Sequence, residues 1–350
     1  MGALDTLEEP KRVVVLGAGS WGTALACLLV ERGHEVTLWG RDPAAVQVMQ
    51  EARENRRYLP GVTLPEALRL SSSLPGLVEG TDACVVALPS MHMREVLTAL
   101  STDFSGVVIC ASKGLERGSL LTMDALIATV WPRSHPVLLS GPTFALEVAH
   151  RKPAAAVAAA HELGAREFAQ QLFNCPRFRV YASEDVVGVA LGGALKNVIA
   201  LAAGCSDGLG YGNNARAALI TRGLAEIGRL AECLGGNPLT LAGLAGLGDL
   251  VLTCTGDLSR NRTVGMALGR GEPLGKVAAR LGQVAEGVET ASTAAELAAR
   301  LGVELPITNE VAAVLQGQRT PAEAVARLLA REIGIELGGR SSVGERERSR

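Results

Sequence analysis

The sequence predicts an α/β protein, with a doubly wound sheet in its N-terminal half and an all-helical C-terminal domain. Three observations support this fold class. A short apolar run at residues 12–16 ends in a glycine-rich turn, and an apolar helical run follows that turn. Further continuous apolar runs are typical of strands buried on both faces of a parallel sheet. Beyond residue 183 the apolar residues recur with helical periodicity, and there is almost no strand pattern.

The glycine-rich turn is the feature around which the N-terminal half is organised. Gly17, Gly19 and Gly22 have the G-x-G-x-x-G spacing. The first glycine permits the tight turn, the second lets the backbone approach a pyrophosphate, and the third lets the helix pack close to its strand. N–H groups and the dipole at the helix start attract the phosphates. The spacing alone is a weak signal, but the strand before it and the helix after it favour a Rossmann-type dinucleotide site over a plain turn.

The end of the next strand bears on the choice of cofactor. Residues 35–39 have the pattern of a second strand, which runs into Gly40, Arg41 and Asp42. An acidic residue at this strand end holds the ribose 2′-OH of NAD, whereas an arginine accommodates the 2′-phosphate of NADP. Asp42, which Pro43 follows, is more typical of a helix cap. We therefore expect NADPH as the cofactor, with NADH as the alternative.

Polar, glycine-rich turns follow three further predicted strands. Apolar runs at residues 83–88, 106–111 and 136–140 end at Pro89-Ser90, Ser112-Lys113-Gly114 and Gly141-Pro142. In open parallel sheets, ligands bind beyond the carboxyl ends of the strands. We therefore expect this edge of the sheet to bind the ligands. Residues 154–160 and 178–181 read as two more strands, with a helix over 162–173 between them.

The chain divides into four predicted segments. Residues 1–10 are expected to be a flexible N-terminus, 11–182 the dinucleotide-binding domain, 183–337 an all-α substrate and catalytic domain, and 338–350 a disordered tail. The helical domain begins at Ser183-Glu184-Asp185, which has an N-cap residue and an acidic first turn. A long apolar helix follows to about Ala203, and helical patterns recur at residues 213–234, 260–268, 288–301, 309–316 and 321–331.

Composition excludes several classes of protein. A net charge of −2 and an aromatic content of 3% argue against a nucleic-acid partner. No apolar run reaches the length that we expect of a membrane span, and the acidic N-terminus is not expected to be a signal peptide. The seven scattered cysteines form no C-x-x-C pair, which favours a reducing, cytoplasmic setting. The five isolated histidines predict no metal site, and there is no G-x-S-x-G motif of a serine hydrolase.

Four places in the chain carry residues suited to chemistry. Lys196 lies inside an apolar helix, where it is either a buried acid or base or a lysine that extends to the surface; the local sequence favours neither. Lys113 directly follows a predicted strand and is either a site residue or a solvated loop lysine. Asp249 lies among apolar residues, where it could also cap a turn. Ser259-Arg260-Asn261-Arg262 supplies two guanidinium groups at a helix start, which suits a phosphate as well as an ordinary surface helix.

Taken in order, these motifs resemble one family. The blocks are Gly17-Ala18-Gly19-Ser20-Trp21-Gly22, Ala111-Ser112-Lys113-Gly114, Ser140-Gly141-Pro142-Thr143-Phe144-Ala145, Leu195-Lys196-Asn197, Gly248-Asp249, Ser259-Arg260-Asn261 and Val284-Ala285-Glu286-Gly287. Together they resemble the bacterial NAD(P)-dependent glycerol-3-phosphate dehydrogenases, over about residues 11–335. The resemblance implies reversible reduction of dihydroxyacetone phosphate to sn-glycerol 3-phosphate, the backbone precursor of glycerophospholipids.

The resemblance also implies roles for individual residues. Lys196 would be the catalytic acid/base, with Lys113 and Asp249 as the other catalytic residues. The implied substrate-binding residues are Lys113, Gly141, Thr143, Lys196, Asp249, Ser259, Arg260 and Asn261. The implied cofactor-binding residues are Gly17, Gly19, Ser20, Trp21, Gly22, Arg41, Lys113, Ala145, Arg260, Val284 and Glu286. Thr143 stands where many relatives have serine, and the hydroxyl group is kept.

Two other functions stay open at this stage. A related dehydrogenase acting on a 3-hydroxy acid or ketopantoate would share the Rossmann-type half and a helical second domain. A non-catalytic regulator that senses NADPH would keep the glycine turn without needing Lys196, Asp249 and Arg260 together. A homodimer is a hypothesis from fold-level analogy, because all-helical second domains often support dimers.

Overall fold

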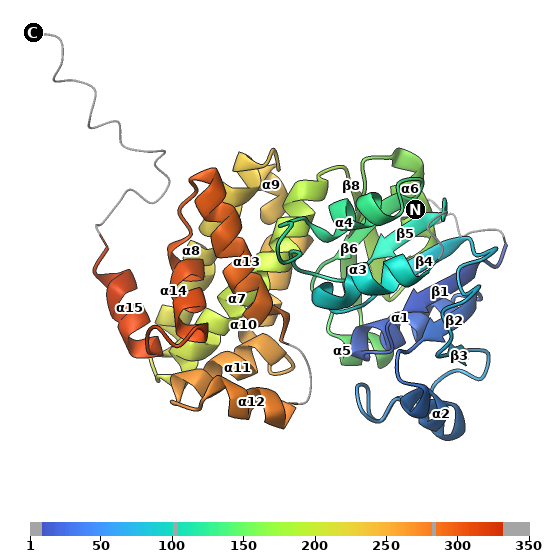
Figure 1. Cartoon of the computed structure of the whole chain (residues 1–350), viewed down its shortest axis with the longest axis horizontal. Helices are drawn as coiled ribbons and strands as arrows, with labels where there is room; N and C mark the ends of the chain where they lie inside the picture. Colours follow the sequence, from blue (N-terminus) through green and yellow to red (C-terminus); the bar gives the residue numbers. More distant parts are fainter. Residues whose placement is uncertain (1–8, 101–103, 282–284, 332–350) are drawn as a thin grey trace, which may run out of the picture.

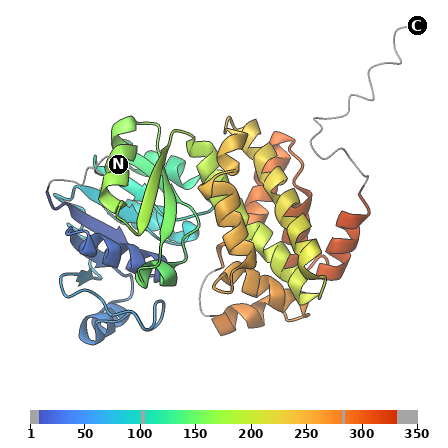
Figure 2. The same ribbon diagram turned by 180° about the vertical axis from the view of Figure 1, so that it is seen from behind.

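The computed structural model describes residues 9–100, 104–281 and 285–331 of the chain. They form two units that lie side by side, one built on a sheet and one built of helices (Figure 1). The view from behind shows the same separation (Figure 2). Most of the predicted N-terminal segment, the predicted tail at 338–350 and Val284 lie outside the described residues.

The first unit is a mostly parallel sheet with strand order β3-β2-β1-β4-β5-β6-β7-β8. Neighbouring strands are parallel except β6 and β7, which pair antiparallel. Hydrophobic clusters lie on both faces, which explains the continuous apolar runs in the sequence. The strands are β1 (Arg12–Leu16), β2 (Glu35–Trp39), β3 (Arg69–Ser71), β4 (Ala83–Val86), β5 (Val107–Cys110), β6 (His135–Ser140), β7 (Ala154–Ala159) and β8 (Phe178–Ser183).

Six helices belong to the sheet unit. They are α1 (Ser20–Glu31), α2 (Pro43–Ala52), α3 (Ser90–Ala99), α4 (Met123–Val130), α5 (Ala145–Ala149) and α6 (Leu163–Phe173). The Asp42 side chain accepts hydrogen bonds from the N–H groups of Ala44 and Ala45, so its predicted role as the cap of α2 is confirmed. The strand β3 and the helices α4 and α5 were not predicted, because a three-residue edge strand and short helices give weak periodicity.

The second unit surrounds one long helix, α7 (Val186–Gly208), whose N-cap is Asp185. Around it lie α8 (Gly212–Cys233), α9 (Pro238–Leu241), the π-helix η1 (Leu244–Gly248), α10 (Asp249–Thr255), α11 (Arg260–Gly269), α12 (Leu274–Leu281), α13 (Glu286–Leu301), α14 (Pro306–Leu315) and α15 (Pro321–Leu329). The prediction of an all-helical second half is confirmed over the described residues, and no strand follows Ser183 there.

The length of α7 corrects one expectation. We predicted no apolar run long enough to span a membrane, yet the 23 residues of α7 are long and apolar enough to do so by length and composition. In the most apolar stretch of this helix, 83% of the stretch is buried inside the protein, as in the core helix of a globular unit. The helix also continues past the predicted end at Ala203.

Glycines bring α7 and α11 into backbone contact. A Cβ atom on Gly204 would lie 2.2 Å from the carbonyl oxygen of Arg262, and one on Gly265 would lie 2.2 Å from that of Leu201. Gly208 and Gly269 repeat the pattern one turn on, at 2.3 Å from the Met266 oxygen and 2.4 Å from the Cys205 oxygen. Because no larger side chain fits, the two helices cross at these glycines. This crossing holds the N-terminal end of α11 beside the middle of α7.

Candidate active site

The glycine-rich turn has the shape that a dinucleotide requires. Gly17 has φ +111°, and a Cβ there would lie 2.5 Å from the carbonyl oxygen of Ala87. A Cβ on Gly22 would lie 2.0 Å from the oxygen of Gly17, so helix α1 is packed against the turn. Nothing lies within 4 Å of a Cβ built on Gly19, which is the N-cap of α1 and offers no side-chain cap. The helix start therefore leaves open space for a phosphate, and these residues fit the cofactor.

Asn55 supports this turn and was not predicted. Its Nδ2 atom donates to the carbonyl oxygen of Ala18 at 2.9 Å and to Oγ1 of Thr23 at 2.8 Å. The residue is 2% exposed. Asn55 lies in a polar segment that reads as an ordinary loop, so the sequence carried no signal for this role.

Arg41 is exposed at the carboxyl end of β2, beside the end of β1. Oδ1 of the neighbouring Asp42 accepts hydrogen bonds from the N–H groups of Ala44 and Ala45 in the first turn of α2, so this carboxylate serves as a helix cap. The guanidinium group of Arg41 lies next to it in the chain. Trp21, which is half-buried, packs beside the turn against the small cluster formed by Ala24, Leu59 and Val62.

Lys113, Asp249 and Lys196 form one chain of charges. Lys113 Nζ donates to Asp249 Oδ2 at 2.5 Å, and Lys196 Nζ donates to Asp249 Oδ1 at 2.5 Å. The exposed fractions of the three side chains are 15%, 2% and 10%. The structure therefore resolves the alternatives for both lysines: Lys196 is buried and paired, and Lys113 is no solvated loop lysine.

Burial and neighbouring charges set the ionisation of this cluster. Burial lowers the pKa of Lys196 to about 8, with the charge of Lys113 acting in the same direction and that of Asp249 opposing it. Burial disfavours the ionised form of Asp249, but the two ammonium groups outweigh it and hold the pKa of that carboxyl below its usual value. Two cations on one carboxylate leave a net positive charge, which suits an anionic substrate.

The positions of these groups depend on packing between the two units. A Cβ on Gly193 would lie 3.0 Å from Oγ of Ser140 and 3.5 Å from Cγ of Lys113. A Cβ on Gly192 would lie 2.7 Å from the carbonyl oxygen of Ala245 in η1. The two glycines, one turn before Lys196, thus let Lys113 and the π-helix approach α7. Asp249 directly follows that π-helix, an element that often occurs at functional sites.

Thr253 completes the immediate surroundings of Lys196 and was not predicted. Lys196 Nζ donates to Thr253 Oγ1 at 2.9 Å, and that hydroxyl donates to the carbonyl oxygen of Asp249 at 2.6 Å. Thr253 lies four residues after Asp249 on α10, so both face α7. The hydroxyl holds the ammonium group of Lys196 in one place.

An amide network joins α7, α11 and α13. Asn261 Nδ2 donates to Asn197 Oδ1 at 3.0 Å, and Asn197 Nδ2 donates to Glu286 Oε2 at 3.2 Å. The backbone N–H of Gly287 donates to Asn261 Oδ1 at 3.0 Å. Burial raises the pKa of Glu286, opposed by the positive charges of Arg260, Lys113 and Lys196. The network fixes the orientation of both amides. Asn197 belongs to the Leu195-Lys196-Asn197 motif, but no role was predicted for it.

The two arginines at the start of α11 have different partners. Ser259 is the N-cap, and its hydroxyl accepts from the N–H of Arg262 at 3.3 Å. The sequence left open whether the two guanidinium groups of this segment bind a phosphate or belong to an ordinary surface helix. Arg262 instead pairs with Asp207 at 2.9 Å and with Asp257 at 3.1 Å, because it lies on the other face of the helix. Arg260 remains as the guanidinium group whose charge acts on buried Glu286.

The loop after β6 brings the remaining predicted residues to the same edge. Gly141 has φ +143°, and a Cβ there would lie 2.9 Å from the carbonyl oxygen of Ala155. The hydroxyl of Thr143 donates to the carbonyl oxygen of Gly141 at 3.3 Å. Ala145 begins α5, which packs against α1 beside the glycine turn. Among the described residues, no group of three or more histidine, cysteine or acidic side chains could hold a metal ion.

Comparison with known proteins agrees with this geometry. The family model described as the NAD-dependent glycerol-3-phosphate dehydrogenase N-terminus matches residues 12–165, and the C-terminal model matches residues 185–326. A relative from Geobacter metallireducens, named glycerol-3-phosphate dehydrogenase [NAD(P)+], is 51% identical over 94% of this chain and 99% of its own. One of the same name from Geobacter sulfurreducens is 52% identical over 93% and 99%.

The fold agrees as well. The crystal structure of glycerol-3-phosphate dehydrogenase from Coxiella burnetii has a TM-score of 0.88 and 40% identity, covering 92% of this chain and 99% of that one. Both family models lie on the two units described above, the sheet and the helices around α7. The chain therefore belongs to the NAD-dependent glycerol-3-phosphate dehydrogenase family of oxidoreductases.

Proposed function

We propose that this protein interconverts dihydroxyacetone phosphate and sn-glycerol 3-phosphate with a nicotinamide cofactor, that Lys196 is the acid/base, and that the product serves glycerophospholipid synthesis. The observation that carries the chemical part is the chain of Lys113, Asp249 and Lys196 at the ligand edge of the sheet. It joins an element of the dinucleotide unit to two elements of the helical unit, where a cofactor and a second ligand would meet.

The chemistry of the cluster suits a ketone reduction. A bound reduced nicotinamide would supply the hydride that adds to the carbonyl carbon. The carbonyl oxygen then gains negative charge, which the ammonium group of Lys196 stabilises before giving it a proton. A lysine with a pKa of about 8 is suited to both directions, because it exchanges its proton near neutral pH. Asp249 and Thr253 orient the ammonium group, and Lys113 adds positive charge beside it.

The N-terminal end of α11 supports binding of the substrate phosphate. We assign Arg260 and Asn261 to this phosphate, with Ser259 beside them. A guanidinium group offers a two-pronged contact to phosphate, and the helix start contributes N–H groups and the positive end of its dipole. The phosphate lies away from the reacting carbon, so its binding energy positions the carbonyl against Lys196. Gly141 and Thr143 are assigned to the opposite side of the substrate.

We also propose NADPH as the preferred cofactor. Arg41 would bind the 2′-phosphate, since the carboxylate of Asp42 is already used as a helix cap. Gly17, Gly19, Ser20, Trp21 and Gly22 would contact the cofactor at the turn. The other contacts are assigned to Lys113, Ala145, Arg260 and Glu286, and to Val284 outside the described residues.

Cellular location and oligomeric state are also part of the proposal. We propose a cytoplasmic location, which fits seven cysteines that are all free. A homodimer stays a prediction that light scattering at several protein concentrations tests.

One experiment tests the proposed reaction against its alternatives. The absorbance of NADPH is followed with dihydroxyacetone phosphate, with a 3-oxo acid and with ketopantoate as separate substrates. We expect rapid oxidation of NADPH with the phosphorylated ketone alone. Turnover with a carboxylate substrate instead would replace the proposal, and NADPH binding without turnover of any substrate would favour a sensor.

A further inference from the structure

A second concave site lies in the helical unit, on the side away from the sheet, between α14 and α15 (Figure 1). Its cavity of about 490 Å³ lies within the range of small-molecule sites. The lining residues are Pro306, Asn309, Glu310, Arg319, Arg327, Leu328, Ala330 and Arg331. None of them belongs to the active site described above.

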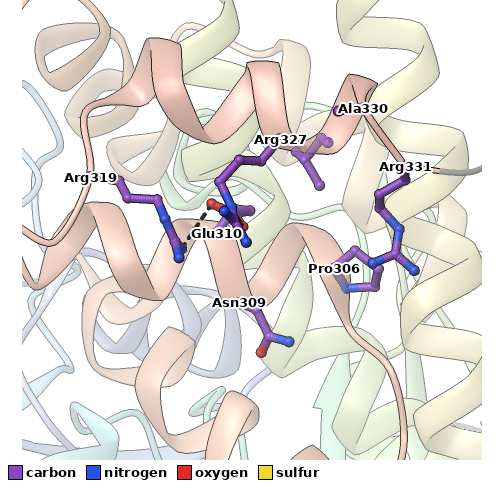
Figure 3. A pocket seen from close by; sticks show the side chains of 8 residues that line it. Pro306, Asn309, Glu310, Arg319, Arg327, Ala330 and Arg331 are labelled. Carbon is purple, nitrogen blue, oxygen red and sulfur yellow. Dashed lines mark hydrogen bonds and ion pairs between the residues drawn. The ribbon is translucent and has the colours of Figure 1, made fainter.

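Two arginines of this cavity, Arg319 and Arg327, face the Glu310 carboxylate, and a third, Arg331, lies apart from them (Figure 3). Arg319 Nη1 lies 3.1 Å from Glu310 Oε2, and Arg327 Nε lies 3.0 Å from Glu310 Oε1. Arg331 Nη2 lies 2.9 Å from Oε2 of Glu304, whose side chain is 77% exposed. The lining therefore has three positive charges and one negative charge. The Glu304 carboxylate, which is not part of the lining, offsets the positive charge of Arg331.

The guanidinium groups keep most of their hydrogen-bonding capacity. Each carries five N–H donors, and in the described part of the chain each forms one ion pair with a carboxylate. Figure 3 shows Arg319 and Arg327 both directed toward Glu310, which lies on the same helix, α14, as Pro306 and Asn309. A guanidinium group presents its donors in a fork geometry that matches phosphate oxygens.

Stability alone gives a weak reason for this arrangement. Half-exposed ion pairs contribute little to folding, and Arg327 and Arg331 are 60% and 51% exposed. Helix α15 already has a capping box formed by Thr320 and Glu323. Glu310, by contrast, is only 12% exposed and holds two guanidinium groups in fixed orientations. Such orientation lowers the entropy that a ligand must overcome on binding.

We infer that this cavity binds a small phosphorylated molecule at a site separate from the active site. Its phosphate oxygens would accept hydrogen bonds from Arg319, Arg327 and Arg331. Glu310 and Asn309 would bind hydroxyl or amine groups of the same molecule, and Leu328 would contact its carbon skeleton. Because α14 also packs against α7, the ligand would lie on a helix that contacts the one carrying Lys196.

Calorimetric titration of the full chain with inorganic pyrophosphate tests the inference. The titration is done in an Arg260→Ala background with saturating NADPH, so that the proposed substrate-phosphate site and the glycine turn contribute little binding. We expect one site per chain, and at least tenfold weaker binding when Arg327→Ala and Arg331→Ala are added. Arg327→Lys keeps the charge but loses the fork, so it should also weaken binding.

Arg300→Ala is the matched control, because Arg300 is also 60% exposed and pairs with Glu296 within α13. It should leave pyrophosphate binding unchanged. Absence of binding in the Arg260→Ala background, or equal affinity in the Arg327→Ala/Arg331→Ala variant, would overturn the inference. Equal weakening by Arg300→Ala would also overturn it, because the effect would then be one of overall charge.

Discussion

The glycine turn and the Lys113–Asp249–Lys196 cluster are specified by the chain in different ways. The turn consists of consecutive residues, and its shape follows from backbone contacts such as Gly22 against Gly17. The cluster joins residues that are 136 and 53 positions apart, on three different elements. It exists only where the helical unit packs on the sheet unit. The comparison implies that cofactor binding and catalysis can be disrupted separately, and by substitutions of different kinds.

Replacing Lys196 separates the two regions most sharply. Lys196→Ala should lower kcat for ketone reduction by about 10²–10⁴-fold, because it removes the proton donor and the charge that stabilises the developing oxyanion. NADPH binding, measured by fluorescence titration, should stay within about twofold of that of the unaltered protein, since the turn is untouched. Lys276→Ala, at an exposed position on α12, is the control. Normal turnover in Lys196→Ala would reject the acid/base assignment.

Arg260 tests whether the helical unit positions the substrate through its phosphate. Arg260→Ala should lower kcat/KM for dihydroxyacetone phosphate by roughly 10–100-fold, the range expected for a lost hydrogen bond to a charged group. At saturating NADPH, which offsets any loss of the cofactor contact assigned to Arg260, reduction of unphosphorylated dihydroxyacetone should fall far less. The control is Arg270→Ala, at the exposed opposite end of the same helix. Equal losses for both ketones would show that Arg260 does not bind the phosphate.

What could be predicted from sequence follows the same division. The strand at Glu35–Trp39 and the cap at Asp42 were predicted correctly, since both depend on local patterns. The state of Lys196 could not be decided, because Asp249 and Thr253 reach it from a helix that begins 53 residues later. The partners of Arg262 could not be predicted either, because Asp207 pairs with it from the end of α7, 55 residues earlier in the chain. The resemblance to a family supplied candidate residues, and the packing shows which of them meet.

The crossing of α7 and α11 should be sensitive to a single methyl group. A Cβ at Gly204 would lie 2.2 Å from the carbonyl oxygen of Arg262, so Gly204→Ala must push the helices apart. We expect a loss of about 1–3 kcal/mol in the free energy of unfolding, measured by urea denaturation. Gly275→Ala is the control, because nothing lies within 4 Å of a Cβ there and alanine favours helix. If both variants were equally stable, the glycine crossing would not be a tight constraint.

The pH dependence of catalysis should reflect the ionisation of the Lys113–Asp249–Lys196 cluster and not the glycine turn. The ammonium form of Lys196 donates the proton during reduction, and its pKa is lowered to about 8, chiefly by burial. At saturating NADPH, kcat/KM for the ketone should therefore fall as pH rises through about 8, while the reverse oxidation should rise. Lys113→Ala removes a like charge, so it should move the inflection to higher pH. An unchanged inflection in Lys113→Ala would argue that another group titrates.

The smallest effect is expected at the exposed end of β2, where Arg41 tests the cofactor preference. Arg41→Ala should raise KM for NADPH by about two- to fivefold, because an exposed ion pair with a 2′-phosphate is weakened by solvent. KM for NADH should stay nearly constant, since NADH lacks that phosphate, and raising the salt concentration should reduce the difference between the variants. The control is Arg57→Ala, at an exposed position. Arg32→Ala would be less suitable, because Arg32 donates a hydrogen bond to the carbonyl oxygen of Gln171. Equal increases in KM for both cofactors would mean that Arg41 contacts a part that they share, and the preference would then have to arise from another residue of the turn.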